Sequence, residues 1–87
     1  MFKTTLTFIT RLEDVADVVD MPALGELVNK YDLLDIGNKN DTIVDGNTFA
    51  SVVTRKWGSE ELALSYKSEI EAMLGEIVTI LVEPYEA

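Results

Sequence analysis

The chain has 87 residues, enough for one hydrophobic core, and we expect a single domain over residues 1–87. It contains no cysteine and no histidine, which excludes disulfides, thiolate and imidazole metal ligands, cysteine nucleophiles and the usual general base. Its 16 acidic against 7 basic residues give a net charge of −9, which argues against direct binding to nucleic acid or to anionic lipids.

No apolar run approaches the roughly 18 residues that a membrane span needs, and Met1 leads into a strand-like segment without a signal-peptide pattern. We therefore expect a cytoplasmic protein with no membrane partner. Acidity of this kind keeps a small protein soluble. The alternative is an acidic DNA mimic or viral inhibitor protein. The acidic residues are spread from Glu13 to Glu86, which favours the first interpretation.

The first predicted element is a strand over Phe2–Thr10, because apolar and polar side chains alternate there. Thr10 and Glu13 fit a capping box, which predicts a helix from about Leu12. Pro22 interrupts that helix, so we expect two pieces, with Asp20 as the second N-cap. The second piece has an apolar face at helical spacing, formed by Leu24, Leu27, Val28 and Tyr31.

Turn-forming residues follow from Asp32 to Asn40, where pairing at Leu33–Ile36 is an open alternative. Asp45-Gly46 predicts a type I′ hairpin between a short strand at 41–44 and a longer one at 47–57. In the longer strand, apolar residues fall on both faces.

Ser59 is the expected N-cap of the next helix, and Gly75 the residue that ends it. Between them runs an apolar stripe formed by Leu62, Ala63, Tyr66, Ile70, Met73 and Leu74. The run Ile77–Val82 predicts a last strand, stopped by Pro84.

This order of elements predicts an α+β, ferredoxin-like βαββαβ fold, with two helices on one face of an antiparallel sheet. The last strand is apolar on both faces, because Ile77 and Leu81 alternate with Val78, Ile80 and Val82. An uncovered apolar sheet face is typical of an association surface. We therefore expect a homodimer through the open sheet face, the alternative being scattered surface residues.

The segment Phe49–Ser68 resembles the dimeric α+β barrel superfamily, particularly its antibiotic-biosynthesis-monooxygenase-like members. In both, a strand ends in tryptophan, here Trp57, and a helix follows with Ser-x-Glu-x-Ala, here Ser59 to Ala63. The resemblance implies a ferredoxin-like protomer that pairs through its sheet into a closed homodimer. Such members include cofactor-free monooxygenases, haem-degrading enzymes, muconolactone-type isomerases and proteins without an assigned activity.

This chain departs from the pattern at the second helix, where members often carry a histidine and Ser65 and Tyr66 stand here. Haem ligation by histidine is excluded, and we expect no cofactor. The resemblance implies that asparagine and tryptophan side chains can serve a cofactor-free oxygenase. No catalytic residue can be assigned, but four such side chains are available: Asn38, Asn40, Asn47 and Trp57.

Candidate ligand-binding residues are Trp57, Arg55 and Tyr66, since an aromatic plane next to cations suits an anionic aromatic ligand. The alternative, which we favour for Trp57 and Tyr66, is a place in the core, with the indole N–H bonded to a carbonyl. The loop carboxylates offer oxygen ligands, but the spacing of a calcium-binding loop is missing, so we expect no metal site. These loop carboxylates are Asp32, Asp35, Asp41 and Asp45.

The leading hypothesis is therefore a homodimeric domain that binds a small organic ligand, or a partner, without catalysis. The alternatives are a cofactor-independent monooxygenase or isomerase of the dimeric α+β barrel type, and an acidic DNA mimic or viral inhibitor.

Overall fold

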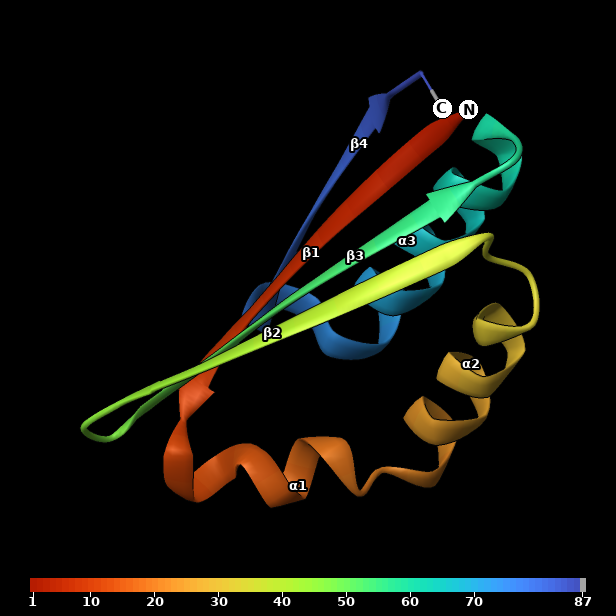
Figure 1. Cartoon of the computed structure of the whole chain (residues 1–87). Coiled ribbons are helices and arrows are strands. Elements are labelled where there is room, and N and C mark those ends of the chain that lie inside the picture. Colours follow the sequence, from red (N-terminus) through yellow and green to blue (C-terminus); the bar gives the residue numbers. More distant parts are fainter. Residues whose placement is uncertain (87) are drawn as a thin grey trace.

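A computed structural model describes residues 1–86 of the chain (Figure 1). These residues form four strands and three α-helices in βαββαβ order, with the first helical region in two pieces. The strands are β1 (Phe2–Arg11), β2 (Gly37–Asp45), β3 (Thr48–Trp57) and β4 (Val78–Pro84). The α-helices are α1 (Val15–Val19), α2 (Pro22–Asp32) and α3 (Glu60–Leu74). Short 3₁₀ helices precede α1 and β4, at Leu12–Asp14 and Gly75–Ile77.

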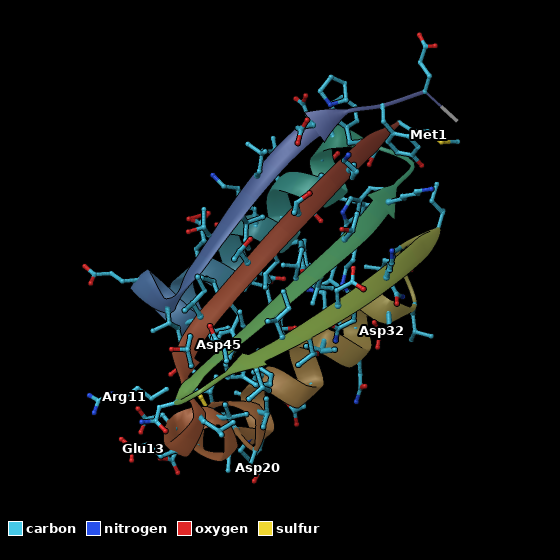
Figure 2. The ribbon with its side chains drawn as sticks, turned by 60° about the vertical axis from the view of Figure 1, so that its left-hand side comes forward. Met1, Arg11, Glu13, Asp20, Asp32 and Asp45 are labelled. Atoms are coloured by element: carbon cyan, nitrogen blue, oxygen red, sulfur yellow. The ribbon has the colours of Figure 1, made fainter. Side chains whose placement is uncertain are left out.

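The four strands form one sheet in the order β2-β3-β1-β4, and each neighbouring pair is antiparallel. Both crossovers therefore pass over one intervening strand, as in a split βαβ unit. The helices all lie on one face of the sheet, and the other face is bare (Figures 1 and 2). The predicted α+β, ferredoxin-like fold is confirmed.

The core lies between the helices and the sheet, as the predicted faces require. Leu6 and Phe8 of β1 are buried, and so are Val78 and Ile80 of β4. The apolar stripes of α2 and α3 face them. Ser59 caps α3 by accepting a hydrogen bond from the Leu62 amide at 3.3 Å, as predicted. In this part of the chain no helix is both long and apolar enough to cross a membrane.

The predicted caps of the first helical region were wrong. The residue before the 3₁₀ helix is Arg11, and no side chain caps this end, because β1 continues through Thr10 and holds it in the strand. The N-cap of α2 is Met21 instead of Asp20, and Pro22 occupies the first turn, where its missing amide costs little. The predicted division into two pieces is confirmed.

The hairpin differs from its prediction by one residue. Its central residues are Gly46 and Asn47, and only Gly46 has a positive φ, of 59°, which is typical of a type II′ turn. β2 is also longer than predicted and begins at Gly37. Leu33–Ile36 lies outside the strands, although the Ile36 amide donates to the Lys56 carbonyl at 2.9 Å.

The predicted two-faced character of the last strand was partly wrong. Ile77 belongs to the 3₁₀ helix that begins at Gly75, and its side chain packs against the core, so it does not face the open side of the sheet. Within β4, Leu81 is the apolar residue on the open face, and Val78, Ile80 and Val82 face the helices. The open face of this strand is therefore less apolar than its sequence indicated.

Candidate functional site

A cavity of about 430 Å³ lies between the helices and the sheet. Along β3 its lining extends from Phe49 to Arg55, and along β2 from Asn38 to Thr42. The side chains of β2 on this side are exposed, because no helix covers this edge strand closely. The sheet therefore lines the cavity on one side and the helices line it on the other, and the cavity is open along β2. Figure 1 shows the helices packed over this face of the sheet.

One part of the cavity is apolar. Its lining side chains come from β1, β3 and all three helices, and are Leu6, Phe8, Val18, Val19, Leu24, Val28, Phe49, Val53, Ile70 and Leu74. Phe8 and Phe49 meet edge to face, with ring centroids 6.0 Å apart. This arrangement suits an aromatic or aliphatic group.

The polar part of the cavity is built around Arg55, which is only 5% exposed. Its Nη1 donates hydrogen bonds to Asp32 Oδ1 and Asp35 Oδ2, both at 2.5 Å. Among the described residues, its Nε is buried without a hydrogen-bond partner. Burial alone would lower the pKa of Arg55, but the two carboxylates raise it above its ordinary value, so the side chain stays charged.

The connection after α2 places these carboxylates. The amides of Leu34 and Asp35 both donate to the Tyr31 carbonyl at 3.0 Å, and the Ile36 amide bonds to β3. This tight turn carries Asp35 over the end of β3, where its side chain is 5% exposed. Asp32, on the last turn of α2, remains 45% exposed.

Side chains of β2 and β3 complete the polar part. Ser51 donates to Asn40 Oδ1 at 2.9 Å, and Asn38 Nδ2 donates to Asp35 Oδ2 at 3.2 Å. Asn38, Asn40 and Ser51 all line the cavity. Hydrogen-bond donors and acceptors therefore lie close together next to an apolar surface.

Two of the three predicted site residues, Arg55 and Tyr66, line the cavity together. The Tyr66 ring centroid is 5.5 Å from Arg55 Cζ. Burial raises the pKa of the Tyr66 hydroxyl, although the positive charge of Arg55 opposes that shift. Tyr66 is thus a neutral aromatic wall of the cavity at neutral pH.

Trp57 does not line the cavity and is fully buried beside it. Its Nε1 donates to the Thr4 hydroxyl at 3.0 Å, and not to a carbonyl. The indole centroid is 5.0 Å from that of Tyr66 and 5.6 Å from that of Tyr31. Trp57 therefore supports the cavity wall from behind.

The sequence did not predict that Asn40 and the ion pairs of Arg55 belong to one site. The feature that could have indicated the ion pairs is Arg55 itself, because it shares a strand face with Val53 and Trp57 and must point inward. A cation on such a face needs buried partners. Of the other asparagines, Asn38 lines the cavity and Asn47 lies in the hairpin turn. Over residues 1–86, no group of three acidic side chains is arranged to hold a metal ion.

The open face of the sheet has a different character. The register places Ile9, Ala50 and Ile43 in one row across β1, β3 and β2, beside Val52. Ile9 and Ile43 are 54% and 60% exposed, and Leu81 of β4 is 55% exposed. Between these apolar residues the face carries mainly threonines.

Charge is distributed unequally between the two sides of the sheet. The open face has both signs, with Lys3, Arg11, Lys39 and Lys56 near Asp41, Asp45 and Glu83. The helices and their connections are strongly acidic, carrying Glu13, Asp14, Asp17, Asp20, Glu26, Asp32, Asp35, Glu60, Glu61, Glu69, Glu71 and Glu76. The open face is thus the side that repels another acidic molecule least.

Comparison with known proteins supports the fold. No protein-family model matches the sequence, and a comparison with curated proteins found no match. Among solved structures, the chain is similar to a de novo designed protein, Foldit4, with a TM-score of 0.64, 14% identity and 98% of each chain covered. It is also similar to an antibiotic biosynthesis monooxygenase, with a TM-score of 0.54, 19% identity and full coverage of both chains.

The resemblance to antibiotic-biosynthesis-monooxygenase-like proteins is thereby confirmed as a likeness of fold over the whole chain. At such identities the likeness shows the fold alone. A designed protein has the same architecture, so the architecture by itself specifies no activity.

Proposed function

We propose that this protein is a homodimeric domain that binds a small organic ligand in the cavity between its helices and its sheet. The observation that carries the proposal is that buried Arg55 and Ser51, together with the exposed side chain of Asn40, converge on a cavity that is otherwise apolar. Binding sites for small molecules typically combine an apolar wall with a few converging polar groups, in volumes of about 300–1,000 Å³.

The alternative explanation for the cavity is loose packing. Protein interiors are close-packed, however, with few voids larger than a water molecule, so a space of about 430 Å³ between helices and sheet is unusual even with one side open along β2. A void left by chance would also favour apolar walls, because a buried cation costs free energy unless it is fully hydrogen-bonded. The polar lining supports a ligand.

Binding can be tested by titrating ¹⁵N-labelled protein with a library of small aromatic and aliphatic fragments. We expect the largest amide shift changes at cavity residues such as Val28, Phe49 and Ile70, with little change at Leu81 on the open face. Shift changes confined to the open face, or none for any fragment, would contradict the proposal.

The homodimer is supported by the open face. It carries exposed Ile9, Ile43 and Leu81 and has both signs of charge, whereas the helical side is acidic. Burying this face against a second copy removes apolar area from water and keeps the acidic sides apart.

Sedimentation velocity over a concentration series tests the dimer. The unmodified chain should sediment as a dimer at micromolar concentration, and Ile43→Asp should shift it to the monomer. Leu33→Asp is the matched control, because Leu33 is 87% exposed on the turn after α2 and should leave the dimer intact. If the unmodified chain remains monomeric, the dimer is refuted. Ligand binding in the cavity is then still decided by the fragment titration.

A second candidate is a cofactor-independent monooxygenase or isomerase. The specific support is the fold likeness to an antibiotic biosynthesis monooxygenase, together with the Asn38 and Asn40 side chains at the cavity. Oxygen uptake with electron-rich phenols tests the monooxygenase activity, whereas an isomerase would change the absorbance spectrum of its substrate without consuming oxygen. Uptake that is lost in Asn40→Ala would favour the enzyme, and a rate equal to that without protein would favour binding alone.

The third interpretation, a DNA mimic or viral inhibitor, receives less support. In a dimer closed through the open faces, both outward sides would be acidic helical layers. Charge would then surround the dimer instead of following one long face, as imitation of a DNA backbone requires.

A further inference from the structure

The unsatisfied part of Arg55 indicates which chemistry the cavity accepts. Both hydrogen bonds of this side chain to carboxylates come from Nη1, and Nε has no partner among the described residues. A buried donor without an acceptor costs free energy, and natural structures leave few of them. Arg55 lines the cavity, so an acceptor atom of a ligand bound there can approach its guanidinium from that side.

The surrounding charge decides what kind of acceptor fits. Two carboxylates, Asp32 and Asp35, already face the single positive charge of Arg55. A third carboxylate or a phosphate placed there would add negative charge to a group whose sum is already negative. Like charges at such distances repel, and partial burial strengthens that repulsion. A neutral oxygen accepts the same hydrogen bond without this repulsion.

Further groups nearby favour a ligand that can also donate. The side chain of Asp32 is 45% exposed, and Asn40 presents an amide on the same side of the sheet. Phe49 and Ile70 lie in the apolar part of the cavity. A ligand that satisfies both parts has a neutral polar group at one end and an aromatic or aliphatic body at the other.

We infer that the cavity selects neutral amphipathic molecules, whose carbonyl or hydroxyl oxygen accepts a hydrogen bond from Arg55, and that it discriminates against organic anions. This inference rests on the proposed ligand-binding function and adds the class of ligand. It also replaces the expectation of an anionic aromatic ligand, because the carboxylates of Asp32 and Asp35 already neutralise the cation.

Two probes of the same shape test the inference: 2-naphthamide, which is neutral, and 2-naphthoate, which is an anion at pH 7. Their dissociation constants can be measured by following cavity amides in ¹⁵N-labelled protein. We expect the amide to bind at least about tenfold more tightly than the carboxylate, which corresponds to about 1.4 kcal/mol.

Asp32→Asn is the informative variant, because it removes one negative charge from the site at a half-exposed position. It should improve binding of 2-naphthoate and bring the dissociation constants of the two probes closer together. Glu13→Gln is the matched control, since it removes the same charge at the opposite end of the helical layer and should leave the ratio unchanged (Figure 2).

The outcomes separate the two proposals. Equal or tighter binding of 2-naphthoate in the unmodified protein would overturn this inference and leave the ligand-binding function standing. This inference would also be overturned if Glu13→Gln reduces the ratio of the two dissociation constants as much as Asp32→Asn does, because the effect would then be one of overall charge. If neither probe binds, this inference is overturned, and the ligand-binding function is decided separately by the fragment library.

Discussion

The two ends of the layer between the helices and the sheet are packed differently. At the end of β3, Trp57 is surrounded by Tyr31 and Tyr66, and the space is filled by three aromatic rings. Further back along the same strand, the helices approach with shorter side chains such as Val18 and Val28 over the small Ser51, and a cavity remains. The aromatic end is therefore where we expect most of the stability to lie, and the hollow end is where we propose that the ligand binds.

Polar contacts reinforce this contrast. Tyr31 of α2 donates a hydrogen bond to Glu69 of α3, and Lys30 pairs with the same carboxylate at 3.3 Å. The hydrogen bond from Tyr31, more than Lys30, lowers the pKa of Glu69. At the hollow end, the equivalent buried donor, Arg55 Nε, has no partner within the described residues.

The largest expected effect comes from truncating the filled end. Trp57→Ala should lower the free energy of unfolding by about 3–5 kcal/mol, because it empties a fully buried site and leaves the Thr4 hydroxyl without its donor. Leu74→Ala should cost only about 1–2 kcal/mol, since Leu74 is half-buried and already borders the cavity. Urea unfolding of both variants measures the difference, and equal losses would contradict the contrast.

Arg55→Met should cost about 3–4 kcal/mol, because it leaves the Asp35 carboxylate buried without its cation. The double variant Arg55→Met with Asp35→Asn should recover at least about 1 kcal/mol. A double-mutant cycle by urea unfolding measures this coupling. Strictly additive losses would show that the pair is not coupled through burial.

Tyr31 should make the protein less stable in alkali. Burial, followed by the hydrogen bond to Glu69 and its charge, raises the pKa of Tyr31 from 10.0 to about 12. The folded state therefore keeps a proton that the unfolded chain loses, so the stabilisation is complete below pH 10 and is lost as the pH rises towards 12. The total loss is about 2–3 kcal/mol.

Urea unfolding at several pH values between 9 and 12 tests this dependence. The free energy of unfolding should fall more steeply in the unmodified protein than in Tyr31→Phe, which has no hydroxyl to titrate. Parallel curves for the two proteins would contradict the assigned pKa.

The smallest effect on stability is expected for filling the hollow end. Val28→Phe adds a ring that the cavity can hold, so the free energy of unfolding should change by less than about 1 kcal/mol in either direction. Fragment binding should be lost, because the ring occupies the space of the ligand. Isothermal titration with the best fragment measures this, and unchanged affinity would place the binding site elsewhere.

Much of the fold could be predicted from local patterns. The alternation in β1 and the apolar stripe of α3 each repeat over several turns or residues, so both elements and their buried faces were correct. The start of β4 was misplaced, because a run of β-branched residues does not show where the turn after Gly75 ends. The capping box at Thr10 failed because strand pairing overrode a local signal.

The site was predictable only in part. Arg55 and Tyr66 were predicted as ligand-binding candidates from an aromatic plane next to cations, and both line the cavity. The pairing of Arg55 with Asp32 and Asp35 joins residues that are 23 and 20 positions apart. It depends on how the turn after α2 folds back over β3, and this geometry has no signature in the sequence.

A crystal structure of the protein with the tightest-binding neutral fragment tests the proposed ligand site most directly. We expect electron density for the fragment between the helices and β3, with an oxygen within hydrogen-bond distance of Arg55 and a ring beside Phe49. A fragment bound on the open face of the sheet or on the outer surface of the helices, with the cavity empty, would contradict it.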